Sequence, residues 1–290
     1  MTSNRTGRPH TLCAVTTHEE GRLEGVGGVE LFWQAWKPEA LRAIVVLAHG
    51  GSEHSGRYAW TAERLADRGY ATYALDHRGH GRSAGPRAYI DRMEHAASDL
   101  DELVHRAAED HPDPPLFLFG HSVGGCISLA YALEHQDTLD GLVLSAPVAA
   151  LEAASPVERV ASHVLSVVAP RLGVYTIDST TVSRDPAVVA DYDQDPLNHH
   201  GKLPARTVHE LSTTVARFPD EVHTLTLPML LMHGTADRLV PIHGTEMVAD
   251  RAGSDDKTFV RYDGLYHELV NEPERERVVD EIADWLDERS

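Results

Sequence analysis

The stretch LFLFGHSVGGCISLA, residues 116–130, joins a short apolar run to a helical pattern through a turn bounded by glycines. The apolar run favours a buried β-strand, and the residues after the turn favour a helix. Gly120-His121-Ser122-Val123-Gly124 lies between them and fits the pattern G-x-S-x-G, in which a serine stands on a sharp strand-to-helix turn. The flanking glycines suit a backbone that passes too close to its neighbours for a side chain. A plain glycine-rich connection is the alternative, but this context favours Ser122 as a nucleophile.

On both sides of this stretch, apolar β-branched runs alternate with helical patterns. This alternation predicts βαβ units and a mostly parallel, doubly wound sheet. The expected parallel strands are residues 43–48, 71–75, 116–119, 141–145, 229–232 and 258–262, and residues 29–36 alternate as an antiparallel edge strand would. The expected helices are residues 59–68, 93–110, 124–135, 242–252 and 273–288.

The rhythm of strands stops between Pro147 and Pro228. Within this gap, residues 155–172 place apolar side chains at helical spacing on one face, namely Val157, Val160, Val164, Leu165 and Val168. We therefore expect a core in two parts, residues 1–147 and 228–290, with residues 148–227 inserted as a helical cap over the edge of the sheet.

The composition limits the classes of partner. The chain has 290 residues, a formal net charge of −19 and 26 basic residues against 45 acidic ones, so nucleic acid is excluded as a partner and a neutral substrate is favoured. No apolar stretch follows Arg5 and Arg8 in the first ten residues, which argues against a signal peptide. Cys13 and Cys126 are distant in sequence and predict no disulfide framework, so a cytoplasmic location is expected.

A serine hydroxyl needs a base to accept its proton and an acid to orient that base. In sheets with this motif the acid and the histidine follow the serine along the chain, in that order. Asp237 stands on the loop after the strand at residues 229–232 and is the preferred acid. The rival loop after Ser145 reads Ala-Pro-Val-Ala and offers no carboxylate. The alternative for Asp237 is a surface residue that caps the next helix.

Position selects the base among 19 histidines. His267 follows the last strand and precedes the final helix, which brings it to the same edge of the sheet. His77 and His80 lie in a glycine- and arginine-rich turn and are expected to be structural, whereas His199 and His200 fall in the insertion. No metal-ligand spacing such as H-E-x-x-H occurs, so we predict neither a metal nor a cofactor.

Two backbone amides are candidates for an oxyanion hole. The strand at residues 43–48 runs into His49-Gly50-Gly51, where a sharp glycine turn can aim the amide of Gly51 at a substrate carbonyl oxygen. The amide of Val123, which follows the nucleophile at the start of a helix, supplies the second donor.

Several longer motifs carry a family resemblance. HGGSEHSGRY (49–58), DHRGHGRS (76–83), GHSVGG (120–125), LSAP (144–147), DPL (195–197), HGTADRLV (233–240) and YHE (266–268) together resemble the monoacylglycerol lipases and related lysophospholipase-like α/β-hydrolases. The resemblance extends from about residue 25 to the C-terminus and implies an α/β-hydrolase fold with a helical cap.

The resemblance also implies roles for particular residues. It agrees with Ser122, Asp237 and His267 as a catalytic triad. It places Glu53 and Arg57 near the polar leaving group and has Tyr192 reach down from the insertion. For Glu53 and Arg57, a buried ion pair that braces the loop is the alternative, and both roles can coexist.

The expected activity is hydrolysis of a monoacylglycerol to glycerol and a fatty acid through an acyl-enzyme. A lysophospholipase or a general carboxylesterase is the alternative within the fold, and a binding module without activity is the alternative outside enzymes. The expected partner is a small lipid ester. The helix at residues 155–172 is expected either to line an acyl tunnel or to make weak, peripheral contact with a membrane surface, and simple packing on the sheet is its alternative.

Overall fold

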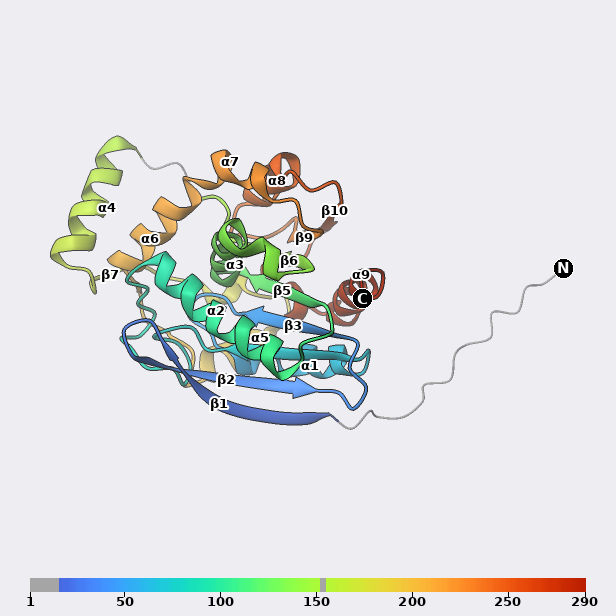
Figure 1. Cartoon of the computed structure of the whole chain (residues 1–290). Coiled ribbons are helices and arrows are strands. Elements are labelled where there is room, and N and C mark those ends of the chain that lie inside the picture. The colour runs from blue at the N-terminus through green and yellow to red at the C-terminus, as the bar shows by residue number, and fades with distance from the viewer. Residues whose placement is uncertain (1–15, 152–154) are drawn as a thin grey trace.

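The computed structural model describes residues 16–151 and 155–290, with one eight-stranded sheet at its centre (Figure 1). The strands lie in the order β1, β2, β4, β3, β5, β6, β9, β10. All neighbours from β4 to β10 are parallel, whereas β2 is antiparallel to both β1 and β4, so the predicted mostly parallel sheet is confirmed. The strands are β1 (Thr17–Gly25), β2 (Val29–Lys37), β3 (Ala43–Ala48), β4 (Tyr70–Leu75), β5 (Leu116–His121), β6 (Gly141–Ser145), β9 (Met229–Gly234) and β10 (Lys257–Tyr262).

The predicted edge strand is one position away from the edge. β2 is antiparallel as expected, but β1 pairs with it over its whole length, from Thr17 opposite Lys37 to Gly25 opposite Val29. The sequence of β1, THEEGRLEG, is almost entirely polar and mostly solvent-accessible, so it lacks the apolar alternation that reveals a strand. The prediction that residues 29–36 form the edge is therefore wrong.

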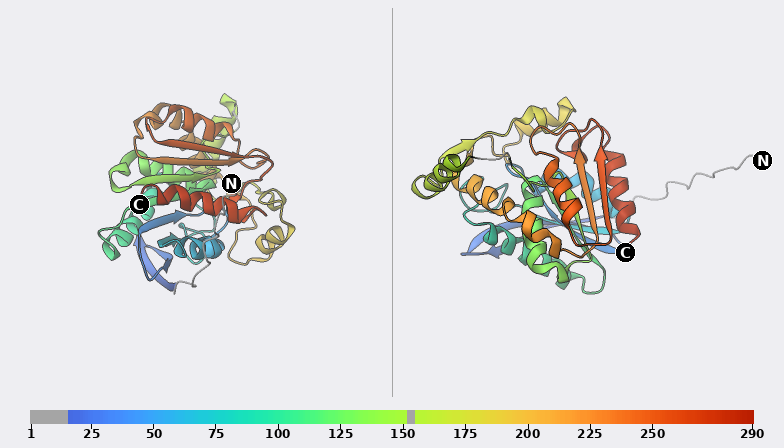
Figure 2. Two further views of the ribbon diagram at one scale, coloured as in Figure 1. Left: turned by 90° about the vertical axis from the view of Figure 1, so that its right-hand side faces the viewer. Right: turned by 90° about the horizontal axis from the view of Figure 1, so that it is seen from above.

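Helices cover both faces of the sheet (Figure 2). α1 (Ala59–Ala66) and α9 (Arg275–Asp287) bury apolar side chains against one face. α2 (Met93–Asp110), α3 (Ser122–His135) and α8 (His243–Arg251) do so against the other. The doubly wound arrangement places the carboxyl ends of β3, β5, β9 and β10 at one edge, where the loops that follow them can meet.

The described residues between β6 and β9 form a mainly helical layer outside the eight-stranded sheet. Its elements are α4 (Pro156–Val168), β7 (Gly173–Tyr175), α5 (Pro186–Gln194), β8 (Leu203–Pro204), α6 (Ala205–Val215) and α7 (Phe218–Glu221). The small antiparallel pair β7–β8 was not expected. The predicted domain limits at residues 148 and 227 stay a prediction.

Helix α4 is shorter than residues 155–172, because Pro170 lies just beyond it and disfavours the helical conformation of the residue before it. α4 packs on α6 and lies at the margin of the molecule (Figures 1 and 2). Its valines face solvent: Val157 is 78% exposed and Val164 is 51% exposed, whereas Leu165 is half-buried.

Two of the expectations fall on residues outside the described ranges, namely the first ten residues and Cys13. Cys126 is a buried, free thiol within α3. Within residues 16–151 and 155–290, no helix has the length and apolar character that a membrane span needs.

Candidate active site

Ser122 is the first residue of α3 and follows β5 without a linker. Its backbone φ angle of 53° lies in the left-handed region, which residues other than glycine rarely adopt, and it marks a sharp turn. A Cβ at Gly124 would lie 2.1 Å from the carbonyl oxygen of Ala48, and one at Gly120 would lie 2.4 Å from Oγ of Ser128. The close backbone approach expected around G-x-S-x-G is therefore present.

Ser122, His267 and Asp237 form one hydrogen-bonded array. The Oγ of Ser122 lies 2.8 Å from Nε2 of His267, and Nδ1 of His267 lies 2.7 Å from Oδ2 of Asp237. An ionised carboxylate can only accept, so Nδ1 of His267 carries hydrogen and Nε2 offers a lone pair to the serine hydroxyl. Ser122 stands at the junction of β5 and α3, whereas Asp237 and His267 stand on the loops after β9 and β10, and these segments meet at one edge of the sheet.

The electrostatic surroundings of His267 and Asp237 suit His267 to accept a proton. Burial alone would lower the pKa of His267, but Asp237, Glu268 and Glu53 outweigh it and raise this pKa above the usual 6.5. Burial alone would raise the pKa of Asp237, but the neighbouring His267 and the hydrogen bonds from His233 and His267 hold this pKa well below its usual value. Asp237 is therefore an anion throughout the neutral range.

The turn after β3 packs directly against the serine. A Cβ at Gly51 would lie 2.9 Å from Cγ2 of Val123, and one at Gly50 would lie 3.2 Å from Cβ of Ser122. Val123 is the second residue of α3, so its amide has no acceptor within the helix. The structure thus brings Gly51 and Val123 together beside Ser122, as an oxyanion hole requires.

Glu53 and Arg57 belong to a buried ionic network. The Nη1 of Arg57 donates to Glu53 at 2.6 Å and to Glu268 at 2.6 Å, and its Nη2 donates to Glu268 at 2.7 Å. The other oxygen of Glu53 accepts from the amide of Gly50 at 2.6 Å and from the hydroxyl of Tyr58 at 2.7 Å. These contacts favour the interpretation that the pair braces the Gly50–Gly51 turn.

Tyr192, on α5 of the helical layer, contacts this network. Its ring covers the Arg57 guanidinium at 4.8 Å from the ring centre, and its side chain is buried. Nearby, the amide of His199 donates to the carbonyl of Ser52 at 2.9 Å. The helical layer therefore contacts the same loop that carries Gly51.

The remaining histidines that the sequence singled out have structural contacts. His77 Nε2 lies 3.1 Å from the carbonyl oxygen of His49, and His80 Nδ1 lies 3.0 Å from that of Arg78. Burial lowers the pKa of His77 to about 3 and that of His80 to about 4, so both are neutral. Within the described ranges, no three His, Cys, Asp or Glu side chains gather as a metal site would need.

Three residues that contact the candidate site residues were not singled out from the sequence. Glu268 follows His267 directly and binds Arg57, so its position in the YHE motif was the available signal. His121 precedes the serine, and its ring centre lies 4.7 Å from that of His267. His233 lies near the end of β9, just before the loop that carries Asp237, and its Nε2 lies 3.2 Å from Oδ2 of Asp237.

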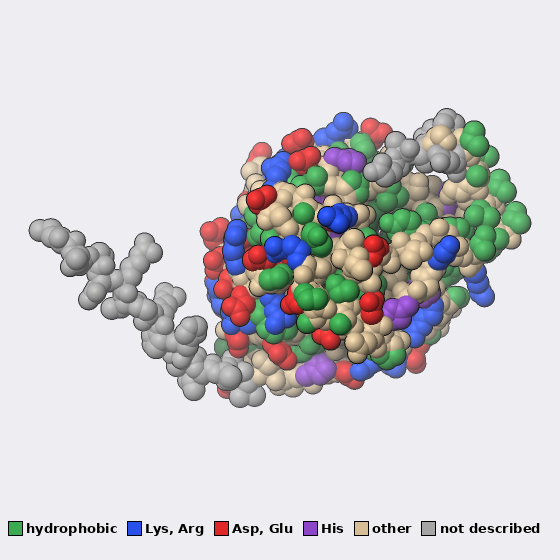
Figure 3. All heavy atoms as spheres, turned by 180° about the vertical axis from the view of Figure 1, so that it is seen from behind, with side chains coloured by type: hydrophobic (Ala, Val, Ile, Leu, Met, Phe, Trp, Pro, Cys, Tyr) green, Lys and Arg blue, Asp and Glu red, His purple; other side chains and the backbone are tan. Residues whose placement is uncertain are grey.

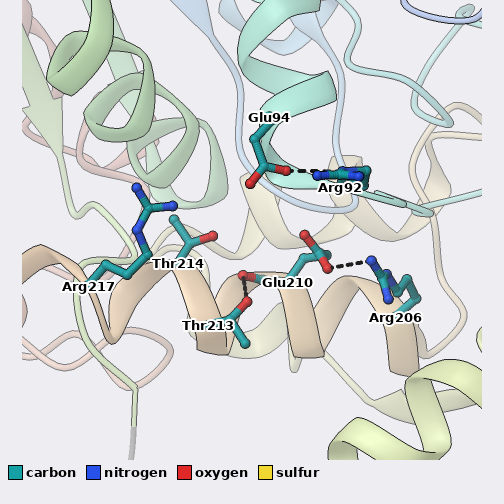
Figure 4. A pocket seen from close by; sticks show the side chains of 7 residues that line it. All are labelled: Arg92, Glu94, Arg206, Glu210, Thr213, Thr214 and Arg217. Carbon is teal, nitrogen blue, oxygen red and sulfur yellow. Dashed lines mark hydrogen bonds and ion pairs between the residues drawn. The ribbon is translucent and has the colours of Figure 1, made fainter.

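A separate cleft of about 380 Å³ lies between the start of α2 and helix α6 (Figure 4). Each of its three arginines already has a glutamate partner, at 3.3 Å for Arg92 with Glu94, 2.8 Å for Arg206 with Glu210, and 2.9 Å for Arg217 with Glu221. Glu210 also accepts from the amide of Met93 at 3.0 Å. Each arginine of the cleft is thus neutralised by a carboxylate, and Glu210 fastens α6 to the first residue of α2.

A hydrogen-bonded serine, histidine and aspartate at the carboxyl edge of a parallel, doubly wound sheet define the class of α/β-hydrolase serine hydrolases. Within this class, the chain belongs to the S33 family: the family model described as "Serine aminopeptidase, S33" matches residues 39–274.

Individual relatives are similar over nearly their whole length. A monoacylglycerol lipase of Mycolicibacterium smegmatis is 43% identical over 273 residues, which are 93% of this chain and 98% of the relative. The monoglyceride lipase of Rattus norvegicus is 36% identical over 272 residues, 92% of this chain and 90% of its own. The crystal structure of Paleococcus ferrophilus monoacylglycerol lipase is 30% identical with a TM-score of 0.80, covering 90% of this chain and 99% of that one. The resemblance to monoacylglycerol-lipase-like α/β-hydrolases is thereby confirmed.

Proposed function

We propose that the protein hydrolyses monoacylglycerols to glycerol and a fatty acid, with Ser122 as nucleophile, His267 as general base and Asp237 as the orienting acid. The observation that carries the proposal is the 43% identity to a monoacylglycerol lipase over nearly the whole of both chains. The hydrogen-bonded order of Ser122, His267 and Asp237 supports the chemistry.

The reaction proceeds in two halves. As the Oγ of Ser122 attacks the ester carbonyl, Nε2 of His267 takes its proton, and the amides of Gly51 and Val123 donate to the oxyanion that forms. His267 then gives the proton to the leaving glycerol, which leaves an acyl group on Ser122. Water attacks this ester with His267 again as the base, and the fatty acid is released.

We propose that the network of Glu53, Arg57 and Glu268 determines the shape of the polar side of the site. Because both Nη atoms of Arg57 are engaged by carboxylates, the network holds the Gly50–Gly51 turn in place through the Gly50 amide. Tyr192 covers the network from the helical layer. A small alcohol such as glycerol would leave next to this rigid, polar wall.

The substrate class is tested with one acyl chain presented in three esters. We expect kcat/KM for the monoacylglycerol to exceed that for the triacylglycerol by about tenfold or more, because two further chains must find room beside the polar wall and the helical layer. The net charge of −19 gives the phosphate of a lysophospholipid no general attraction, so that ester should also be slower. An equal kcat/KM for the triacylglycerol would contradict the proposal. A higher kcat/KM for the lysophospholipid would show that the protein is a lysophospholipase instead.

The pH dependence follows from the base. His267 must be neutral to accept the hydroxyl proton of Ser122, so kcat/KM should rise with pH as His267 loses its proton. Because the surrounding carboxylates raise the pKa of His267, the midpoint of this rise should lie above 6.5. Initial rates on a soluble short-chain ester across the range in which the protein stays folded measure it. A flat profile through this range would count against His267 as the base.

We further propose that the protein contacts lipid surfaces through α4. Exposed apolar side chains gather along this helix (Figure 3). They are Val157, Val160, Val164, Val167 and Val168. One apolar helix face without a second anchor supports only weak, reversible binding. The proposed location is cytoplasmic, with peripheral membrane contact.

The lipid contact is tested by Val160→Asp with Val164→Asp. Both side chains are exposed, so the fold should persist, but two charges on the apolar face should lower activity on dispersed long-chain esters by about tenfold through lost surface binding. Activity on a soluble short-chain ester should stay unchanged. Ala40→Asp with Ala108→Asp adds the same charge at exposed positions and serves as the control. Equal losses on both kinds of ester would show damage to packing instead.

A further inference from the structure

His233 occupies a position that the proposed mechanism leaves without a role. It lies near the end of β9, and its side chain is fully buried. Its Nε2 lies 3.2 Å from Oδ2 of Asp237 and 3.1 Å from the carbonyl oxygen of Val240. Its Nδ1 lies 2.7 Å from Oγ1 of Thr245 in α8, and Thr245 is also fully buried. Both ring nitrogens are therefore engaged.

These contacts determine where the imidazole hydrogen sits. Carbonyl and carboxylate oxygens only accept, so a lone pair on Nε2 would face two acceptors in a buried setting, at a high cost in free energy. Nε2 must therefore carry the hydrogen and share it between Asp237 and Val240. The hydroxyl of Thr245 can donate to Nδ1, which makes the neutral ring with hydrogen on Nε2 the satisfied form.

Oδ2 of Asp237 accepts from Nδ1 of His267 at 2.7 Å, and Nε2 of His233 lies 3.2 Å from the same oxygen, where its hydrogen bond helps to lower the pKa of Asp237. Oδ1 accepts from the amides of Leu239 and Val240 at 2.8 and 3.0 Å. The backbone donors fix one oxygen, and the two histidines fix the other. The carboxylate is held in one orientation, and its negative charge is divided between two imidazole partners.

We propose that His233 is a positioning residue of the reaction, which acts by hydrogen bonding to Asp237 and so sets both the orientation and the basicity of His267. The chain of contacts runs from Thr245 through His233, Asp237 and His267 to Ser122. The proposal rests on the assignment of Asp237 and His267 in the proposed function.

A purely structural role for His233 predicts different results. It would tie β9 to α8 and to the loop at residues 237–240, and its loss would lower thermal stability without changing the pH profile. A positioning role instead requires a change in kcat at unchanged KM and a change in the titration of His267. The other groups that face His267 are Ser122, His121, Glu53 and Glu268, and none of them is altered in the variants below.

The test compares His233→Leu with His233→Gln. Leucine fills the space without a donor, whereas the glutamine amide can place a donor near the position of Nε2. In His233→Leu we expect kcat to fall about tenfold, the effect of losing a hydrogen bond to a charged group, with KM unchanged. The acid limb of kcat/KM should move to higher pH, because Oδ2 then directs its charge at His267 alone. His233→Gln should recover most of both losses.

Thr245→Val keeps the test decisive if His233→Leu does not fold. It removes the hydroxyl donor to Nδ1, and we expect a smaller fall in kcat of about threefold, which Thr245→Ser should restore. The NMR signal of the Nδ1 hydrogen of His267 should shift in both His233→Leu and Thr245→Val. Unchanged kcat, acid limb and NMR signal in a folded His233→Leu protein, or in Thr245→Val where the former is unfolded, would overturn the proposal.

Failure of the proposed function gives a different result. If Asp237 and His267 are not the acid and base, Asp237→Asn keeps full activity and the wild-type protein shows no downfield Nδ1 hydrogen, whatever the His233 variants do.

Discussion

Ser122→Ala is expected to lower ester turnover by about a thousandfold or more while leaving the fold intact, since removing the proposed nucleophile would leave only substrate binding and the proposed oxyanion hole. Alanine retains the Cβ that the turn already accommodates. The same variant should show no covalent labelling by a fluorophosphonate probe. Turnover and labelling together separate a lost nucleophile from a general defect.

Ser128→Ala is the matched control for this experiment. Ser128 lies on the same helix, is fully buried, and its hydroxyl has no hydrogen-bond partner among the described residues. Removing it should leave labelling and turnover near the wild-type level. Full labelling of Ser122→Ala would show that the probe reacts elsewhere and that Ser122 is not the nucleophile.

Asp237→Asn is expected to lower kcat by about ten-thousandfold, as a wrong histidine tautomer does in a serine triad. The amides of Leu239 and Val240 require an acceptor at Oδ1, so the carboxamide oxygen must lie there and its NH2 group must face His267. His267 then places its hydrogen on Nε2, which faces Ser122 and can no longer accept the hydroxyl proton.

Asp263→Asn removes a charge from an exposed aspartate on the neighbouring loop and is the control. It should leave kcat unchanged, whereas Asp237→Asn should lose kcat at all pH values at which His267 is neutral. A reduction of only a few fold in Asp237→Asn would indicate that another carboxylate orients His267.

The central part of the fold was predictable because its strands are buried on both faces. Such strands appear as continuous apolar runs, as in AIVVLA at β3, where every residue is buried. β1 was missed because its pairing with β2 depends on backbone hydrogen bonds rather than on apolar side chains. β7 and β8 were missed because strands of three and two residues carry no periodicity.

The proposed triad was predictable because each member follows a recognisable strand. Parallel strands bring their carboxyl ends to one edge, so position along the chain was enough to expect that Ser122, Asp237 and His267 would meet. The contacts of Arg57 with Glu268 join residues 211 positions apart, and no local pattern reveals such a pair. The role of His233 likewise depends on two distances of about 3 Å that only coordinates supply.

The proposed hydrolysis of monoacylglycerols at Ser122 is tested most directly by glycerol release from a pure monoacylglycerol, measured before and after graded modification of the protein by a fluorophosphonate. We expect glycerol and fatty acid to appear in equal amounts, and the rate to fall in proportion to the fraction of Ser122 modified, as mapped by peptide mass spectrometry. Absence of glycerol release from the unmodified protein, or release that persists when Ser122 is fully modified, would contradict it.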